Sequence, residues 1–171
     1  MRVHNVHSRE LPAPAGRAWE LVAGLASRHD QLWPTERWPT CPIVFDRPLG
    51  AGARGGHGSI RYDVERYEPG ERVVFRFARG SGLDGVHGLE VAAIDAARSR
   101  LTHTLDARVE WKLRPVYRVL LKAHDALVED LLDNAERATG GRPLPSLPLP
   151  RLVRVANAVE GGFMRIPRPA A

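Results

Sequence analysis

A disulfide within the chain is excluded, because Cys41 is the only cysteine among its 171 residues. Nothing around Cys41 would activate a thiolate, so we expect a structural side chain rather than a nucleophile. No stretch approaches the roughly 18 consecutive apolar residues of a membrane-spanning helix. No apolar segment of signal-peptide length follows the first charged residues. These absences predict a cytoplasmic protein without an integral membrane span.

Clusters of one charge are also missing, although the formal net charge is +5. The arginines are spread singly along the chain, with no run of five or six cations. No basic stripe is interleaved with aromatic residues, as single-stranded nucleic acid would require. The charge therefore predicts a solvated basic surface and no nucleic-acid partner.

Two familiar catalytic signatures are absent as well. The glycine-rich segment Gly50–Gly58 lacks the Gly-Lys-Ser/Thr ending of a phosphate-binding loop, and no helical pattern follows it. We interpret this segment as a flexible turn between strands. No serine lies in a nucleophile elbow, and no Ser-His-Asp signature is visible.

What the chain does contain is the alternation of apolar and polar residues that is typical of strands. The clearest example is Ser99–Trp111, where every second side chain from Leu101 onward is apolar or histidine. The same pattern, bounded by turn residues, predicts a series of strands. They cover Val3–Leu11, Ile43–Arg47, His57–Tyr67, Glu71–Ala78, Val86–Asp95 and Ser99–Trp111.

Two segments show helical periodicity instead. Ala15–Ser27 is a short amphipathic helix, and a long helix begins near Pro115. The polar arc of the long helix holds Arg118, Lys122, Asp125, Glu129, Asp133 and Glu136. This order of elements predicts an α+β fold, in which a curved antiparallel sheet wraps around a long C-terminal helix. We expect residues 1–139 to form this domain, and residues 140–171 to form a Pro-rich linker and a C-terminal arm.

Three histidines occupy positions where an apolar residue is expected. His87 and His103 fall on the inward faces of their strands, and His124 falls near the middle of the apolar arc of the long helix. A buried imidazole costs free energy unless it is hydrogen-bonded or lines a cavity. These positions therefore indicate a partly polar interior. Counting back from Tyr62 along one strand places His57 on the opposite face, as a rim residue.

Two tryptophans lie in the irregular segment Arg28–Pro42. Trp33 and Trp38 each precede a proline, which favours extended backbone. Either the segment packs as an ordinary loop, or it caps the mouth of a cavity.

Five segments in the first 139 residues carry a resemblance to a known superfamily: Leu11–Pro14 leading into Ala18-Trp19, Gly56–Tyr62, Tyr67–Phe77, Gly85–Val91 and Arg100–Leu105. In this order they resemble the helix-grip superfamily of START-like proteins, also called SRPBCC. The group includes lipid-transfer domains, plant pathogenesis-related ligand carriers and bacterial polyketide cyclases.

The resemblance implies an apolar cavity between the sheet and the long helix. It supplies no invariant catalytic set, so no residue role is carried over. The residues expected to form the cavity wall and contact a ligand are Tyr62, Val64, Phe75, Phe77, Leu89, Leu105, Trp111, Tyr117 and Leu121.

The leading functional hypothesis is the binding of a small hydrophobic molecule, such as a lipid, a polyketide or an aromatic metabolite. The first alternative is a polyketide cyclase or dehydratase in which His87, His103 and His124 are the catalytic acid–base groups. The second is a non-catalytic interaction protein that uses its C-terminal arm. That arm would dock on its own domain, on a second copy as a homodimer, or on a membrane surface. We expect no cofactor and no metal, because the three histidines come from separate elements without short ligand spacing.

Overall fold

The computed structural model describes residues 1–145, 148–149, 151 and 153–155. Their main element is a seven-stranded antiparallel sheet in the order β1-β7-β6-β5-β4-β3-β2. The strands are β1 (Arg2–Leu11), β2 (Ile43–Phe45), β3 (Arg54–His57), β4 (Ile60–Glu68), β5 (Arg72–Phe77), β6 (Leu83–Ala93) and β7 (Ser99–Val109).

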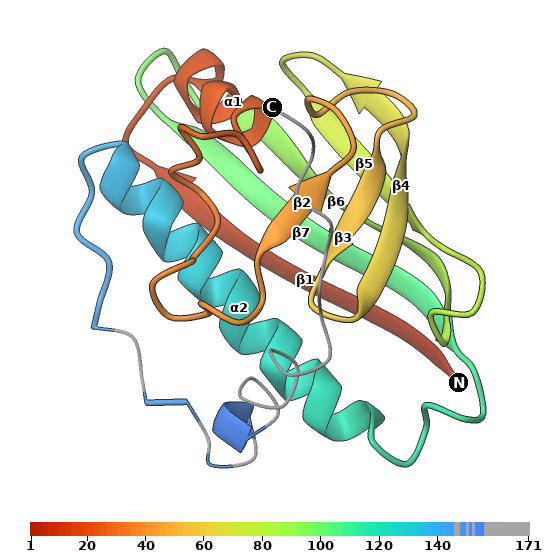
Figure 1. Ribbon diagram of the computed structural model, residues 1–171. Coiled ribbons are helices and arrows are strands. Elements are labelled where there is room, and N and C mark those ends of the chain that lie inside the picture. Colours follow the sequence, from red (N-terminus) through yellow and green to blue (C-terminus); the bar gives the residue numbers. More distant parts are fainter. Residues whose placement is uncertain (146–147, 150, 152, 156–171) are drawn as a thin grey trace.

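Helix α2 (Tyr117–Ala138) lies across one face of the curved sheet, and the shorter α1 (Ala15–Ala23) sits at one end of it (Figure 1). The apolar side of α2 packs on the sheet through its C-terminal half, where Leu127, Leu131 and Leu132 are buried. Burial of this amphipathic face provides most of the stabilisation that a helix obtains in a protein. The predicted α+β architecture is therefore confirmed.

Strand β7 follows the predicted alternation, since its side chains from Leu101 to Val109 point alternately into the core and outward. It pairs along its whole length with β1, from Arg2 opposite Arg108 to Leu11 opposite Ser99. The interior side chains project from the curved sheet, of which this long ladder is a part.

The inward placement of Trp111 is wrong. Strand β7 ends at Val109, and the chain then turns, with the amide of Leu113 donating to the carbonyl of Glu110. Period-two alternation has no meaning beyond the last strand residue. The Trp111 side chain is consequently 71% exposed, and Leu113 points to the interior in its place.

The glycine-rich segment is also more than a turn, because β3 lies within it. A Cβ atom on Gly55 would lie only 2.0 Å from the carbonyl oxygen of Val44 on the neighbouring strand. Glycine therefore permits a close approach of β2 to β3 that no other residue allows. Because glycine is depleted in strands, the pattern predicted a loop instead.

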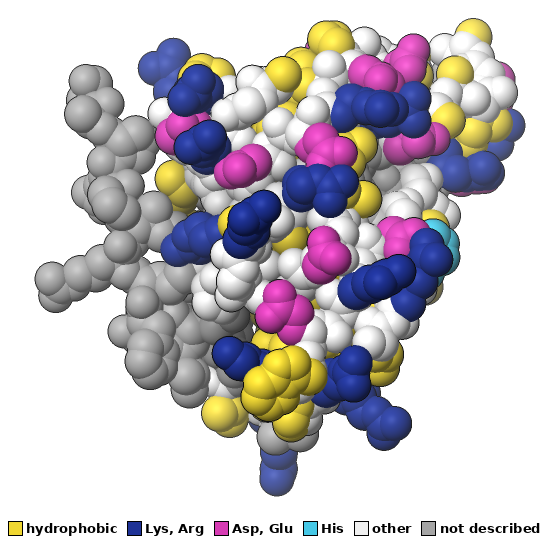
Figure 2. Space-filling model, turned by 90° about the vertical axis from the view of Figure 1, so that its right-hand side faces the viewer, with side chains coloured by type: hydrophobic (Ala, Val, Ile, Leu, Met, Phe, Trp, Pro, Cys, Tyr) yellow, Lys and Arg dark blue, Asp and Glu magenta, His cyan; other side chains and the backbone are white. Residues whose placement is uncertain are grey.

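Charges of both signs are interleaved on the face shown in Figure 2. Ion pairs between neighbouring strands include Arg2 with Asp106 and Arg100 with Glu10, at 3.1 and 2.7 Å. No helix within the described ranges combines the length and the apolar character needed to cross a bilayer.

Part of the C-terminal arm is described and contacts the domain. Residues 151 and 153–155 are helical, and Val153 is buried in the same hydrophobic core as α1 and α2. Leu149 packs partly against that core. Residues 146–147, 150, 152 and 156–171 of the arm lie outside the described residues.

Candidate functional site

A cavity of about 130 Å³ lies between the sheet and α2. Most of the predicted wall residues line it, together with all three predicted histidines. The predicted residues that line the cavity are Tyr62, Phe75, Phe77, Leu89, Leu105, Tyr117, Leu121, His87, His103 and His124. Val64 is instead buried in the hydrophobic core without lining the cavity, and Trp111 lies outside it on the surface.

The segment with two tryptophans forms one wall of the cavity, since both indole rings line it. Trp38 Nε1 donates to the buried Asp130 carboxylate of α2 at 2.8 Å, and Trp33 Nε1 donates to the carbonyl of Cys41 at 2.9 Å. The Asp30 carboxylate accepts the amides of Leu32 and Trp33. These bonds fix the segment against the cavity.

Three imidazole rings follow one another along the cavity wall. His87 stacks between Phe75 and Phe77, with ring centroids 5.0 and 4.8 Å away. His103 lies 5.7 Å from His87 and 5.0 Å from His124, again between centroids. The row therefore runs from the middle of the sheet, across β7, to the helix.

Several polar atoms of this wall have no hydrogen-bond partner among the described residues. They are Nε2 of His87, Nδ1 of His103, Nδ1 of His124 and the hydroxyl of Tyr117. An unpaired buried polar group costs about 1–3 kcal/mol. Such groups are uncommon in native proteins, and they indicate a position where a ligand or water binds.

Burial keeps the imidazoles of His87 and His103 neutral. It lowers the pKa of both well below the ordinary value of 6.5, and the nearby histidines, with which a second positive charge would be repulsive, lower both further. A neutral imidazole has one nitrogen that donates and one that accepts a hydrogen bond. The wall therefore offers both kinds of partner to a molecule in the cavity.

His57 belongs to the site, and the sequence analysis placed it on the wrong face. Its Nδ1 lies 2.9 Å from the hydroxyl of Tyr62, and its ring lines the cavity. Burial lowers the pKa of His57 to about 3. His57 is on β3, opposite Ile60 on β4, so the hairpin at Gly58 and Ser59 reverses the count of faces. Counting through the two strands as one gave the opposite face.

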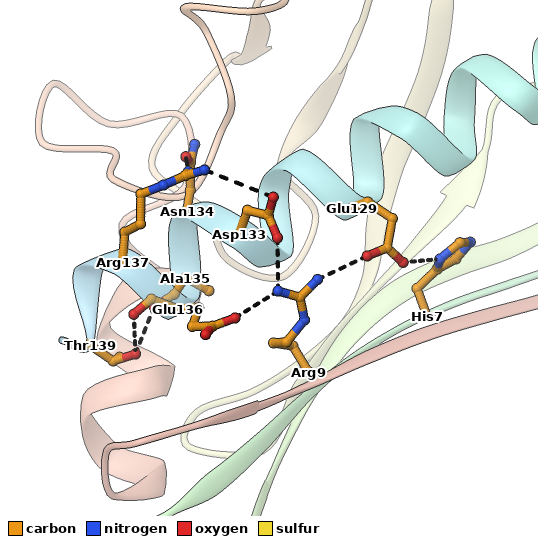
Figure 3. A network of polar contacts seen from close by, with 9 residues as sticks. All are labelled: His7, Arg9, Glu129, Asp133, Asn134, Ala135, Glu136, Arg137 and Thr139. Atoms are coloured by element: carbon orange, nitrogen blue, oxygen red, sulfur yellow. Dashed lines mark hydrogen bonds and ion pairs between the residues drawn. The ribbon is translucent and has the colours of Figure 1, made fainter. Parts of the chain in front are cut away.

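A second polar cluster lies where β1 meets α2. His7 Nδ1 is 2.7 Å from Glu129 Oε1, and His7 Nε2 is 3.3 Å from Asp125 Oδ1. Glu129 also accepts from Arg9 Nη2 at 2.9 Å, and Arg9 continues to Asp133 and Glu136 (Figure 3). No pattern in the sequence indicates this cluster.

Asp125 joins the cluster to the cavity wall. Its Oδ1 lies 3.5 Å from Nδ1 of His124, whose ring lines the cavity. Burial tends to raise the pKa of Asp125, but the neighbouring imidazoles of His124 and His7 outweigh it and hold that pKa below its usual value.

No protein-family model and no curated protein sequence matches the chain. Solved structures do match over most of its length. The chain has the helix-grip fold. CalU16 from Micromonospora echinospora is 16% identical over 94% of this chain and 87% of its own, with a TM-score of 0.58.

Two further matches carry enzyme names. Norcoclaurine synthase from Thalictrum flavum is 12% identical, with 83% of this chain and 96% of its own covered and a TM-score of 0.60. The ZhuI aromatase/cyclase from Streptomyces sp. R1128 is 18% identical, with 82% and 99% covered and a TM-score of 0.56. These proteins are SRPBCC helix-grip proteins. The likeness confirms the predicted fold, and it assigns no ligand because one fold serves many functions.

Proposed function

We propose that the protein binds a small, mostly apolar molecule with a single aromatic ring in the cavity. The observation that carries this proposal is a hollow with apolar walls and unpaired imidazole nitrogens. A dry apolar cavity of roughly 150 Å³ holds benzene. At about 130 Å³, the cavity suits one ring. A lipid or a polyketide would require the wall to open, since pockets for larger ligands enclose roughly 300–1,000 Å³.

The unpaired wall atoms favour a ring with a hydroxyl or carbonyl substituent. Such a group satisfies Nδ1 of His103 or Nε2 of His87, whose desolvation is otherwise uncompensated. Phenol and toluene, which have nearly the same size, test this by titration calorimetry. We expect phenol to bind about tenfold more tightly, the equivalent of one hydrogen bond.

Two substitutions make the experiment decisive. Leu105→Trp fills the cavity and should abolish binding of both compounds, whereas His103→Phe should keep toluene binding and reduce the preference for phenol. Saturable binding that persists unchanged in Leu105→Trp would place the ligand elsewhere and reject the proposal. Absence of binding to the native chain, tested also with larger phenols, would reject it too.

A second candidate function is acid–base catalysis of a cyclisation or dehydration. The observation that favours it is the presence of imidazoles that burial keeps neutral, since a neutral imidazole is the basic form. His87 or His103 would remove a proton next to a ketone, while His124 or Tyr117 polarises a carbonyl. Turnover of polyketide-like substrates that survives replacement of both His87 and His103 would reject this candidate.

The C-terminal arm provides the third proposal, in which residues 140–171 join two copies of the chain as a homodimer. We also propose that the protein stays in the cytoplasm and does not bind nucleic acid. The described part of the arm packs on its own domain through Val153, so an exchange between copies would use the same core position. Deletion of residues 140–171 tests this by light scattering. Unchanged assembly and ligand uptake would make the arm a passive tail.

A further inference from the structure

The polar cluster between β1 and α2 contains three side chains of a kind that binds metal ions. One ring nitrogen each of His7 and His124 and a carboxylate oxygen of Asp125 lie within 4.8 Å of one another. All three side chains are partly buried, and the cavity proposal does not require a metal here. We propose that His7, His124 and Asp125 bind a divalent transition-metal ion, for which Zn²⁺ is the best fit.

The spacing of the atoms suits a tetrahedral ion. Tetrahedral Zn²⁺ with bonds of about 2.0–2.1 Å places its ligand atoms about 3.3–3.4 Å apart. Asp125 Oδ1 is 3.3 Å from His7 Nε2 and 3.5 Å from His124 Nδ1. Both separations match the edge of the tetrahedron, and the third, between the two histidines, is within 4.8 Å.

The hydrogen-bond geometry of His7 suits a metal ligand. Its Nδ1 lies 2.7 Å from Glu129 Oε1, the geometry in which a neutral ring donates to the carboxylate and leaves the Nε2 lone pair free. Metal-binding histidines almost always donate their second nitrogen in this way. Arg9 holds Glu129 in place from the other side (Figure 3). Glu129 is therefore a positioning residue for His7.

His124 provides a second observation that points to an ion at this position. Its Nδ1 is buried and lacks a hydrogen-bond partner within the described part of the chain, although it faces Asp125. Asn5 Nδ2 donates to Asp125 Oδ1 at 3.2 Å and orients that carboxylate. An ion bound between the two would satisfy Nδ1 of His124 and remove its desolvation cost.

The charge of this side of α2 favours a cation. Four carboxylates occur along it, those of Asp125, Glu129, Asp133 and Glu136, and the guanidinium groups of Arg9 and Arg137 pair with them. The side chain of Asp125 is 38% exposed, which gives an ion a path from solvent. Three protein ligands leave a fourth position for water, as in zinc sites that are not purely structural.

The direct test is titration of the metal-free full chain with Zn²⁺ by calorimetry, and with Co²⁺ by visible absorption. We expect one ion per chain and the intense visible bands of tetrahedral Co²⁺. His7→Gln, His124→Gln and Asp125→Asn should each lower the Zn²⁺ affinity at least tenfold. Glu129→Gln, which removes the negative charge that His7 and Arg9 share, should lower it by about 10- to 100-fold.

His4→Gln is the matched control. His4 is an exposed histidine on the same strand, 3.8 Å from Asp106, and its loss should leave Zn²⁺ affinity unchanged. Zn²⁺, unlike Mg²⁺, should also raise the unfolding midpoint of the native chain, because a ligand of the folded state alone stabilises it. This second readout does not depend on the folding of any variant.

Two results would overturn the proposal. One is stoichiometric Zn²⁺ binding with the same affinity in the native chain, His7→Gln and His124→Gln. The other is the absence of both binding and thermal stabilisation, which would leave His7 as an imidazolium paired with two carboxylates. Neither result affects toluene and phenol binding in the cavity, so this proposal and the proposed function fail separately.

Discussion

Two neighbouring histidines of the sheet have different surroundings beneath helix α2. His7 on β1 and His103 on β7 are directly opposite each other in the strand register. His103 lies among aromatic and apolar groups, and its Nδ1 has no partner in the described chain, whereas both ring nitrogens of His7 lie close to carboxylates of α2. His124 stands between them, 5.0 Å from the His103 ring and 6.3 Å from the His7 ring.

The difference arises from the helix rather than from the sheet. On the cavity side, α2 contributes the apolar side chains of Leu120, Leu121 and Leu127 to the wall. The unpaired imidazole nitrogens there are therefore desolvated without compensation. Next to β1, the helix presents Asp125 and Glu129. The same residue type thus becomes a neutral ligand contact on one side and part of a charged cluster on the other.

The largest expected effect comes from breaking the cavity side. Phe75 is 3% exposed and stacks on both Phe45 and His87. Phe75→Ala should lower the free energy of unfolding by about 3–5 kcal/mol, because it removes buried apolar surface and enlarges the cavity. Urea denaturation measures this loss, and a saturating small aromatic compound should restore part of it. Phe75→Leu, the milder control, should cost about half as much or less. A loss below about 1 kcal/mol for Phe75→Ala would contradict the packing of this wall.

The second largest effect is expected on the charged side, where His7 and Arg9 of β1 meet the carboxylates of α2. Arg9 donates to Glu129, Asp133 and Glu136, two of which are largely buried. Arg9→Met keeps the aliphatic stem and should destabilise the fold by about 2–3 kcal/mol, because three neighbouring carboxylates lose their common cation. The control is Arg2→Met on the same strand, where the ion pair with Asp106 is exposed and its loss should not be measurable. Equal effects of the two substitutions would show that the Arg9 network contributes no more than a surface ion pair.

The third prediction concerns how the free energy of unfolding depends on pH, which the buried histidines of the cavity side determine. His57, His87 and His103 have pKa values lowered by burial, so below about pH 6.5 the unfolded chain binds protons that the folded chain does not. The free energy of unfolding should therefore fall as the pH drops from 6.5 to 4.5 and stay level above 6.5. Each such histidine contributes a slope of up to about 1.4 kcal/mol per pH unit.

His103→Phe should reduce this slope, and replacement of the exposed His4 by Gln should not. The comparison is made by urea denaturation at several pH values between 4.5 and 7.5. If His103→Phe had the full slope of the native chain, the imidazole of His103 would be solvated and the cavity side would not be dry.

The inward faces of His87 and His103 could be predicted because their signals are local. Strict alternation runs through His87 in β6 and His103 in β7, so the faces of these residues follow from counting alone. His57 was missed because a two-residue hairpin lies between it and the strand used for counting. The change from loop to strand at Gly55 is invisible to propensity, since it depends on the approach of a neighbouring strand.

The charged side could not be predicted, because no local pattern connects its members. His7 and Glu129 are 122 residues apart. Asp125 and Glu129 belong to the polar arc of the long helix, and the same arc fits solvent as well as the edge of a sheet. The rotation and position of α2 against β1 decide which of these occurs, and they depend on the packing of the whole core.

The smallest expected effect concerns Trp111, whose pattern position suggested a ligand contact. The indole is 71% exposed, beyond the end of β7, with the Lys112 ammonium 5.6 Å from its ring centre. Trp111→Ser should leave phenol and toluene binding unchanged and alter the free energy of unfolding by less than about 0.5 kcal/mol. The internal comparison is Leu105→Trp, six residues earlier on the inward face of β7, which should abolish binding. A loss of ligand affinity in Trp111→Ser would mean that the Trp111 ring folds over the occupied cavity. Trp111 would then belong to the cavity wall after all.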